Sequence, residues 1–307
     1  MKKKKNTKNT LPILIVILIG LIYGMLNDFI GQTESKETEV NVNTTPKILE
    51  NISANLEVYY LDVGQADSIL IKCNSEYMLI DAGNNNDGPL LVKYFKSLNI
   101  NNFKYVVATH PHEDHIGGLD DIIKNFDIDT LYMANAITTT KTFENVLDAL
   151  EEKNMTYKVP KLDTTFSLGD AYIKVIYTDD NAKDLNDSSI VLKLTYKNNT
   201  FLFTGDLSSK EDDNILNKDI SAQILKVSHH GSKYSTTSNF LDKVDPKYAI
   251  ISVGKNNIYN HPADSTISKL KERNIKIYRT DELGTILIKS DGNNINISNF
   301  NTDTDGD

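Results

Sequence analysis

The sequence predicts an α/β fold in which two mixed β-sheets pack face to face and carry helices on their outer faces. Three observations lead to this prediction. Strand-like runs outnumber helix-like runs, most of them come in pairs separated by short turns, and helical segments are interspersed among them from residue 56 to residue 290. The single cysteine, Cys73, excludes an intrachain disulfide, so the core must be stable without one.

The first half of this region begins with strands. Runs at 56–63, 67–73 and 76–83 are β-rich and separated by turn residues, which indicates an antiparallel meander. Residues 90–100 are expected to form a helix, 104–110 a buried strand, and 117–126 a second helix. The chain therefore changes from hairpins to alternating helices and strands.

The second half repeats this mixture. A helix is expected at 142–153, and strands are expected at 171–177, 189–196 and 200–206. Further strands are expected at 222–231, 246–254, 275–280 and 284–290, with a helix at 264–273. We assign residues 56–298 to one folded domain and 299–307 to a disordered acidic tail.

The N-terminus has the pattern of a membrane anchor. Residues 1–10 form a basic tail, and 11–30 form an apolar run of about 20 residues, enough to cross a bilayer as a helix. The lysines before this run predict a cytoplasmic N-terminus and a single-pass protein whose domain is extracellular. The alternative is a cleaved signal peptide, but no small-residue cleavage site follows the run. Residues 31–55 are polar and predict a linker.

The charge of the chain after residue 30 argues against nucleic acid as a partner. After residue 30 the chain keeps 28 basic and 41 acidic residues, a net charge near −13. A broad basic face for gripping nucleic acid is therefore not expected, because phosphate contacts need clustered Lys and Arg. The bilayer is the partner that the N-terminal helix predicts, and no protein partner is indicated.

Half of the histidines lie in one short turn. The chain has six, and THPHEDHIGG (109–118) holds His110, His112 and His115 together with Asp114. Random placement gives this histidine spacing with a probability on the order of 2 × 10⁻³. His110 and His112 share one face at the end of a strand. The turn can thus serve two neighbouring ions, which would hold a bridging hydroxide between them. Imidazole with carboxylate suits zinc, manganese or iron.

The motif H-x-H-x-D-H resembles the signature of the metallo-β-lactamase superfamily. Other stretches resemble the corresponding domain of ComEC-type DNA-uptake proteins, in the expected order. These stretches are LDVGQADSILI, MLIDAG, NDSSIVLKL, FLFTGD, LKVSHHGSKYSTTSNFL, PKYAIISVGKNNIYNHP and YRTDELGTI. The resemblance covers residues 56–290 and implies a four-layer αββα sandwich. The multi-spanning channel of ComEC is not present in this sequence.

The resemblance also implies a ligand set for two divalent ions, zinc or manganese. His110 and His112 would hold the first ion, and Asp114 and His115 the second. Asp206 would bridge both, and His230 would complete the second site. The residues expected to take part in catalysis are Asp114, Asp206, His229 and His261.

One departure from the family concerns the first ion. Many members have a further histidine before FTGD, but none lies between His115 and His229 in this chain. Asp187, in NDSS (186–189), is the expected oxygen ligand in its place, with Asn186 as a hydrogen-bond partner. The alternative is that Asp187 only caps a turn. An oxygen-richer site favours manganese.

Residues around the ligands have expected supporting roles. Asp81 is predicted to accept a hydrogen bond from a ligand imidazole, since metal-bound histidines need an oriented second nitrogen. Asp62 and Asp67 are weaker candidates, with a turn cap as the alternative for Asp62. Hydroxyl groups after HHG would contact phosphate or, alternatively, cap the next helix; they belong to Ser232, Ser235, Thr236 and Thr237.

Three functions are compatible with these features. The leading one is a membrane-anchored extracellular hydrolase of phosphodiesters, nuclease-like, acting on DNA or on a cell-wall phosphodiester. The second is a lactonase or β-lactamase type of ester or amide hydrolase. The third is a non-catalytic surface protein with a structural metal site.

Overall fold

The computed structural model describes residues 55–300. The segments predicted as basic tail, anchor and most of the linker, and residues 301–307 of the predicted tail, lie outside this range. Among the helices between residues 55 and 300, none combines the length and the apolar character that a bilayer crossing requires.

The first sheet contains eight strands in the order β15-β14-β1-β2-β3-β4-β5-β6. It is antiparallel from β15 to β3 and parallel from β3 to β6, so the predicted meander β1-β2-β3 is confirmed. Its strands are β1 (Leu56–Tyr60), β2 (Ile69–Cys73), β3 (Glu76–Ile80), β4 (Asn102–Ala108), β5 (Asp127–Met133), β6 (Tyr157–Lys158), β14 (Thr285–Ser290) and β15 (Ile295–Phe300).

The second sheet contains seven strands in the order β13-β12-β11-β10-β9-β8-β7. The pairs from β7 to β10 are antiparallel and those from β10 to β13 are parallel, so both sheets are mixed as predicted. Its strands are β7 (Thr165–Leu168), β8 (Ala171–Tyr177), β9 (Val191–Tyr196), β10 (Asn199–Phe203), β11 (Ile224–Lys226), β12 (Tyr248–Ile251) and β13 (Lys276–Arg279).

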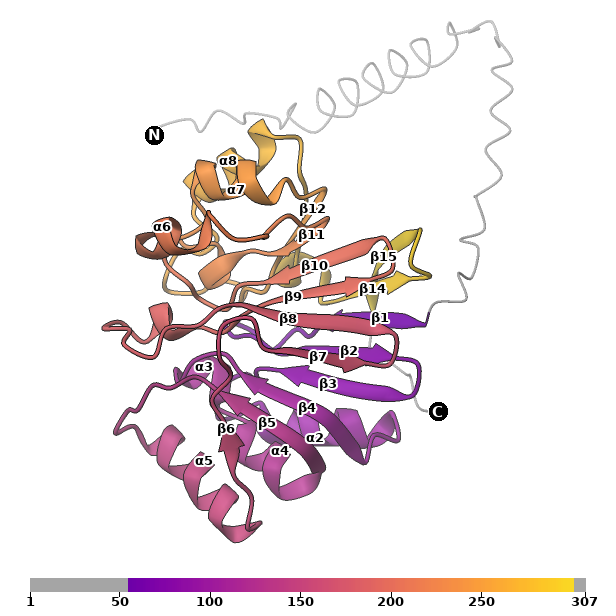
Figure 1. Ribbon diagram of the computed structural model, residues 1–307, viewed down its shortest axis with the longest axis vertical. Helices are drawn as coiled ribbons and strands as arrows, with labels where there is room; N and C mark the ends of the chain where they lie inside the picture. The colour runs from indigo at the N-terminus through magenta and orange to yellow at the C-terminus, as the bar shows by residue number, and fades with distance from the viewer. Residues whose placement is uncertain (1–54, 301–307) are drawn as a thin grey trace, which may run out of the picture. The chain divides into compact units, whose positions relative to one another are not determined.

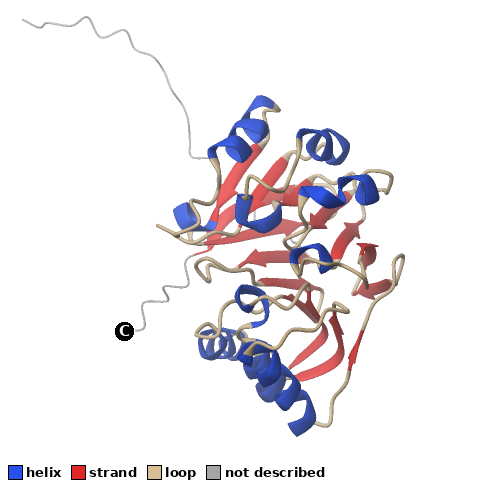
Figure 2. Cartoon of the chain, turned by 90° about the vertical axis from the view of Figure 1, so that its left-hand side faces the viewer, coloured by secondary structure: helices blue, strands red, loops and turns tan. Residues whose placement is uncertain are grey.

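The helices cover the two outer faces, which Figure 2 shows in blue on either side of the red strands. Over the first sheet lie α2 (Gly88–Ser97), α4 (Leu119–Asn125) and α5 (Lys141–Glu152), and over the second lie α6 (Asp212–Ile215), α7 (Ser238–Val244) and α8 (Asp264–Glu272). Short helical turns occur within loops, namely α3 (Glu113–Ile116), α9 (Thr280–Leu283), η1 (Asn186–Ser188), η2 (Ser209–Glu211) and η3 (Ser228–Gly231). The predicted αββα layering is confirmed.

The alternation of side chains along the strands builds these layers. In β1, Val58 and Tyr60 point into the core between the sheets, whereas Tyr59 faces the helices. In β10, Phe201 and Phe203 belong to the central core and Leu202 to the core under the second helical layer. Each sheet is therefore apolar on both faces, which explains why many strands are continuous apolar runs.

Strands β5, β6, β7 and β15 were not predicted. The last of these, β15, pairs with β14 at the edge of the first sheet, and Figure 1 shows both in yellow beside β1. It includes Asn299 and Phe300, which we had assigned to the acidic tail. The Phe300 ring contacts Tyr59, with centroids 5.5 Å apart. An edge strand rich in Asn and Ser has the composition of a loop, so its pairing depends on β14 rather than on its own sequence.

Candidate metal centre

The histidine turn connects β4 to α4 and packs closely against the loop that follows β3. Ala82 N donates to His115 O at 2.7 Å, and Gly117 N donates to Gly83 O at 2.8 Å. A Cβ on Gly117 would lie 2.1 Å from the carbonyl carbon of Asn84, so only glycine allows this approach. The two glycines after the histidines therefore fix the turn against the first sheet.

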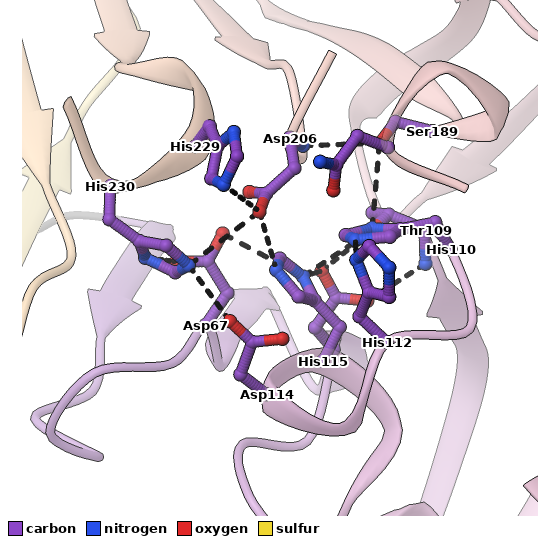
Figure 3. Close-up of polar contacts among 12 residues, drawn as sticks. Asp67, Thr109, His110, His112, Asp114, His115, Ser189, Asp206, His229 and His230 are labelled. Carbon is purple, nitrogen blue, oxygen red and sulfur yellow. Dashed lines mark hydrogen bonds and ion pairs between the residues drawn. The ribbon is translucent and has the colours of Figure 1, made fainter. Parts of the chain in front are cut away.

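Four side chains from three separate loops form the outer cluster: Asp114, His115, Asp206 and His230. Each offers one ligand atom, and these atoms all lie within 4.8 Å of one another. His115 Nε2 is 3.3 Å from Asp206 Oδ2, and His230 Nε2 is 3.3 Å from Asp114 Oδ2 and 3.7 Å from Asp206 Oδ2. Figure 3 shows these side chains pointing toward a common centre.

Two buried atoms indicate that the outer cluster fits a metal ion. His115 Nε2 and Asp206 Oδ1 are shielded from solvent and have no hydrogen-bond partner. Buried polar atoms normally have partners, so an unsatisfied nitrogen and an unsatisfied oxygen facing the same centre need an explanation. Two imidazoles and two carboxylates form a donor set that suits zinc or manganese.

His110 and His112 form a histidine pair beside the outer cluster. His110 Nε2 and His112 Nδ1 face each other at 2.9 Å, and the His110 ring lies 4.1 Å from the His115 ring. The other nitrogen of His110, Nδ1, is near Thr109 Oγ1 at 3.2 Å and Ser189 Oγ at 3.4 Å. The pair thus presents two nitrogens at one point, as the first predicted metal site requires.

Asp187 lies close to this region but is not among the grouped ligands. Within residues 55–300, neither of the two groups of three or more clustered ligand atoms includes Asp187, His110 or His112. Asp187 is buried in η1, and its Oδ1 accepts a hydrogen bond from Ser208 N at 3.2 Å. This contact supports the alternative in which Asp187 fixes a loop. A role as ligand stays a prediction.

His229, His230 and His261 come from the second half of the chain. His229 and His230 both have φ near 50°, a left-handed conformation that turns their rings in different directions. His229 Nε2 lies 3.7 Å from Asp206 Oδ2. A Cβ on Gly231 would lie 2.5 Å from Pro262 Cβ, and this close packing brings the His261 ring within 5.5 Å of the His229 ring. All six histidines therefore meet in one place.

Asp81 has the supporting role that the sequence predicted. Its carboxylate accepts hydrogen bonds from Thr109 N at 2.8 Å and from Thr109 Oγ1 at 2.7 Å, and it contacts His115 Nδ1 at 2.8 Å. His230 Nδ1 is oriented in a similar way by Ser252 O at 2.9 Å. Each of these two candidate ligands thus has its Nδ1 held by the protein and its Nε2 within the outer cluster.

Three residues beside the candidate metal centre were missed or judged less important from the sequence. Asp67, a weak candidate from sequence, is buried, and its Oδ2 lies 2.6 Å from Nζ of Lys226, which is also buried. Lys226 was not singled out, although a lysine inside the apolar run ILKV before the HHG motif was a visible signal. Ser189 Oγ accepts a hydrogen bond from Asp206 N at 3.1 Å and was also missed.

The remaining candidates form hydrogen bonds that stabilise a turn, a helix end and a loop. Asp62 Oδ1 accepts a hydrogen bond from Gly64 N, which is the predicted turn cap. Thr237 Oγ1 accepts a hydrogen bond from Phe240 N at the start of α7, so the predicted helix cap is confirmed for this residue. Ser235 Oγ donates to Ser228 O at 2.9 Å and stabilises the loop between them.

The electrostatics of the outer cluster favour a cation. Burial alone lowers the pKa of His115, but the carboxylates of Asp206, Asp81 and Asp114 outweigh it and raise that pKa well above its usual range. Burial raises the pKa of Asp206, yet the neighbouring His115 and His230 hold it well below its usual value. A field that favours a proton on a buried imidazole also favours a metal cation.

The histidines further from the carboxylates behave differently. Burial, together with His115, lowers the pKa of His110, and burial with His229 and His230 lowers the pKa of His261 to about 4. Neutral imidazoles are the form that binds metals, so His110 can coordinate without first losing a proton.

The comparisons with known proteins agree with this geometry. The family model described as the metallo-beta-lactamase superfamily matches residues 61–255. ComE operon protein 3 of Bacillus subtilis is 29% identical over 256 residues, covering 76% of this chain and 33% of that protein. Competence protein ComA of Neisseria gonorrhoeae is 27% identical over 249 residues, covering 80% of this chain and 33% of that protein. The chain thus spans about a third of the length of these curated relatives.

Solved structures show the same fold at low identity. CmlA, a diiron beta-hydroxylase from Streptomyces venezuelae, superposes with a TM-score of 0.51 at 11% identity, covering 77% of this chain and 54% of that one. Igni18, a metallo hydrolase from Ignicoccus hospitalis, superposes with a TM-score of 0.50 at 15% identity, covering 76% and 99%.

Proposed function

This chain belongs to the metallo-beta-lactamase superfamily, as its motifs predicted, and we propose that it is a metal-dependent phosphodiesterase. The observation that carries the proposal is the convergence of the histidine pair and the outer cluster at one centre, where buried His115 Nε2 and Asp206 Oδ1 have no partner. A buried set of ligands this close to one another suits a pair of divalent ions, zinc or manganese.

The residues that would hold these ions are proposed from the clustered side chains together with the family resemblance. The outer cluster would hold one ion, and the histidine pair would hold the other, with Asp206 between them. Asp187 is proposed as a further oxygen donor from the resemblance alone. Ions held there would supply Lewis acidity and an activated water for hydrolysis. Asp114 has a side chain 29% exposed, so the outer cluster opens to solvent on that side.

His229 and His261 are the candidates for contact with substrate. The His229 side chain is 28% exposed, whereas that of His230 is buried. His261 stacks on Tyr259, with centroids 5.8 Å apart, and Tyr259 is largely exposed. These rings lie on the accessible side of the proposed ligands, where they can hydrogen-bond to a phosphodiester. The negative charge of that group would favour the protonated imidazole that a leaving group needs.

DNA and a cell-wall phosphodiester are the two substrates that we propose. The name of one relative, competence protein ComA, refers to competence, which favours DNA. The net charge near −13 after residue 30 disfavours a long polyanion and leaves room for a smaller wall diester. We further propose that residues 11–30 anchor the chain in the cell membrane with the domain outside.

Hydrolysis of bis-p-nitrophenyl phosphate by the full chain, purified with Mn²⁺ or Zn²⁺, tests the proposal. His112→Ala and Asp206→Ala should each lower turnover by on the order of 100-fold or more. Asp148→Ala, which removes an exposed carboxylate on α5 outside both groups of clustered ligand atoms, is the matched control and should leave turnover unchanged. Unchanged turnover in both site variants would show that the metal centre is not the catalyst.

A structural metal site is the second candidate. The outer cluster alone supplies four ligands, the usual number for a closed structural zinc site. This function predicts a single tightly held ion per chain and no ester hydrolysis. Elemental analysis together with the turnover assay separates the two functions. Cleavage of a β-lactam or lactone above background would instead identify an ester or amide hydrolase.

A further inference from the structure

Lys226 is a buried lysine directly behind the candidate metal centre. It ends β11 and is 1% exposed, and its Nζ lies 2.6 Å from Asp67 Oδ2 and donates to Val227 O at 3.2 Å. Removing an ammonium group from water is costly, and an apolar residue of similar length would fill the same space without that cost. The charge of Lys226 therefore needs an explanation beyond packing.

The carboxylate that Lys226 contacts belongs to a second group of possible ligands. Asp67, Asp81 and His115 form this inner cluster; one ligand atom of each lies within 4.8 Å of the others, and all three residues are buried. Asp67 Oδ1 has no hydrogen-bond partner and lies 3.6 Å from His230 Nδ1. Two carboxylates with an unsatisfied oxygen would attract a divalent ion if no other cation were present.

We propose that Lys226 is a built-in cation that occupies the inner cluster and thereby confines divalent ions to the outer cluster and the histidine pair. The inference rests on the proposed function, because it assigns a task to Lys226 only if the outer cluster binds metal. Lys226 is a positioning residue, because its buried ammonium group contacts Asp67 and would not touch a substrate.

The contacts of His115 show why the inner cluster must be kept free of metal. Its Nδ1 contacts Asp81 at 2.8 Å, and its Nε2 faces Asp206 at 3.3 Å. An ion bound at the inner cluster would take Asp81 as a ligand and release the ring that Asp81 orients. An ammonium group neutralises Asp67 but cannot accept a hydrogen bond, so it cannot take the place of Asp81 as the acceptor for His115 Nδ1–H.

Lys226→Met and Asp67→Asn, alone and combined, test the inference in the full chain. Lys193→Met is the matched control, because Lys193 lies on β9, two strands away from β11 in the same sheet, and pairs with exposed Asp219 at 2.8 Å. Two readouts are measured: bound Mn²⁺ per chain by elemental analysis, and the rise in melting temperature when MnCl₂ is added to metal-free protein. Neither readout depends on activity.

Relative to the wild type, the rise in melting temperature caused by Mn²⁺ should be larger in one single variant and smaller in the other. Lys226→Met frees the inner cluster, so it should bind one more ion than the wild type and gain more in melting temperature from Mn²⁺. Asp67→Asn leaves an unpaired ammonium group beside the ligands, so it should gain less than the wild type. The double variant removes both charges and should match the wild type, as should Lys193→Met.

Other outcomes would overturn the inference. The inference is wrong if Mn²⁺ raises the melting temperature of both single variants by less than that of the wild type, or by the same amount. The ion pair would then only stabilise the packing of the core. If Lys226→Met loses its fold without metal, Mn²⁺ should restore it, and a failure to restore it counts equally against the inference. A wild type that binds no Mn²⁺ would contradict the proposed function instead, so the two failures are distinguishable.

Discussion

Gly117→Ala should displace the histidine turn without straining its own backbone. Gly117 has φ −57° and ψ −44°, which alanine adopts freely, so the effect of the change is steric alone. The new Cβ would lie 2.1 Å from the carbonyl carbon of Asn84 and 2.2 Å from Asn85 N, whereas ordinary contact begins at 3.4 Å. Both neighbours are backbone atoms, so one of the two loops has to move by about 1 Å.

The magnitude of the effect follows from this shift. Overpacking of a well-packed interior costs about 1–3 kcal/mol of folding free energy. His115 and Asp114 lie two and three residues before Gly117 and would move with it. Because a displacement of about 1 Å at a catalytic centre lowers rates by on the order of 100-fold, we expect that loss in phosphodiester turnover.

Thermal unfolding, metal titration and turnover should be measured on the same preparations. Gly284→Ala is the control, because a Cβ there meets no atom within 4 Å. It should lose stability through its positive φ but keep metal affinity and turnover. The steric argument would be refuted if Gly117→Ala bound metal within about twofold of the wild type, since a displaced ligand costs on the order of tenfold or more.

Three further predictions concern single side chains. Asp81→Asn should weaken metal binding by about 10–100-fold, because His115 Nδ1 loses its carboxylate, whereas Asp87→Asn at the far end of the same loop should not; equal affinities in a chelator competition would contradict this. Thr237→Ala removes a helix cap and should lower the unfolding free energy by about 1 kcal/mol in a denaturant titration, with unchanged metal content. His261→Ala should keep metal binding in the same titration but lower turnover by about 100-fold, and a loss of metal instead would identify His261 as a ligand.

Much of the fold was visible in the sequence because most strands carry their own signal. Runs such as AYIKVIY, which forms β8, are apolar enough to be recognised alone, and their hairpin spacing predicted the meander of the first sheet. Strand β15 and the two-residue strand β6 carry no such signal, because the strand beside each of them determines its pairing. Local patterns cannot reveal edge strands of this kind.

Some residues of the candidate site could likewise be predicted from the sequence, and others could not. His110, His112, Asp114 and His115 lie within six residues, so their grouping followed from spacing alone. The ion pair of Lys226 with Asp67 joins strand β11 to a loop before β2, far away in the chain, and no local pattern pointed to it. A buried lysine in an apolar strand was nonetheless an exception that sequence reasoning should have noticed.

The sequence by itself determined the chemistry of this protein: which side chains can bind a metal, and which runs form strands. Those properties reside in short segments, where composition and spacing are enough. Only the tertiary structure decided that Asp206, His230 and His261 meet the histidine turn, that Asp187 contacts Ser208, and that an ammonium group lies among the buried carboxylates. The physical reason is that the loops at the ends of β4, β10, β11 and β12 meet only when the two sheets pack against each other.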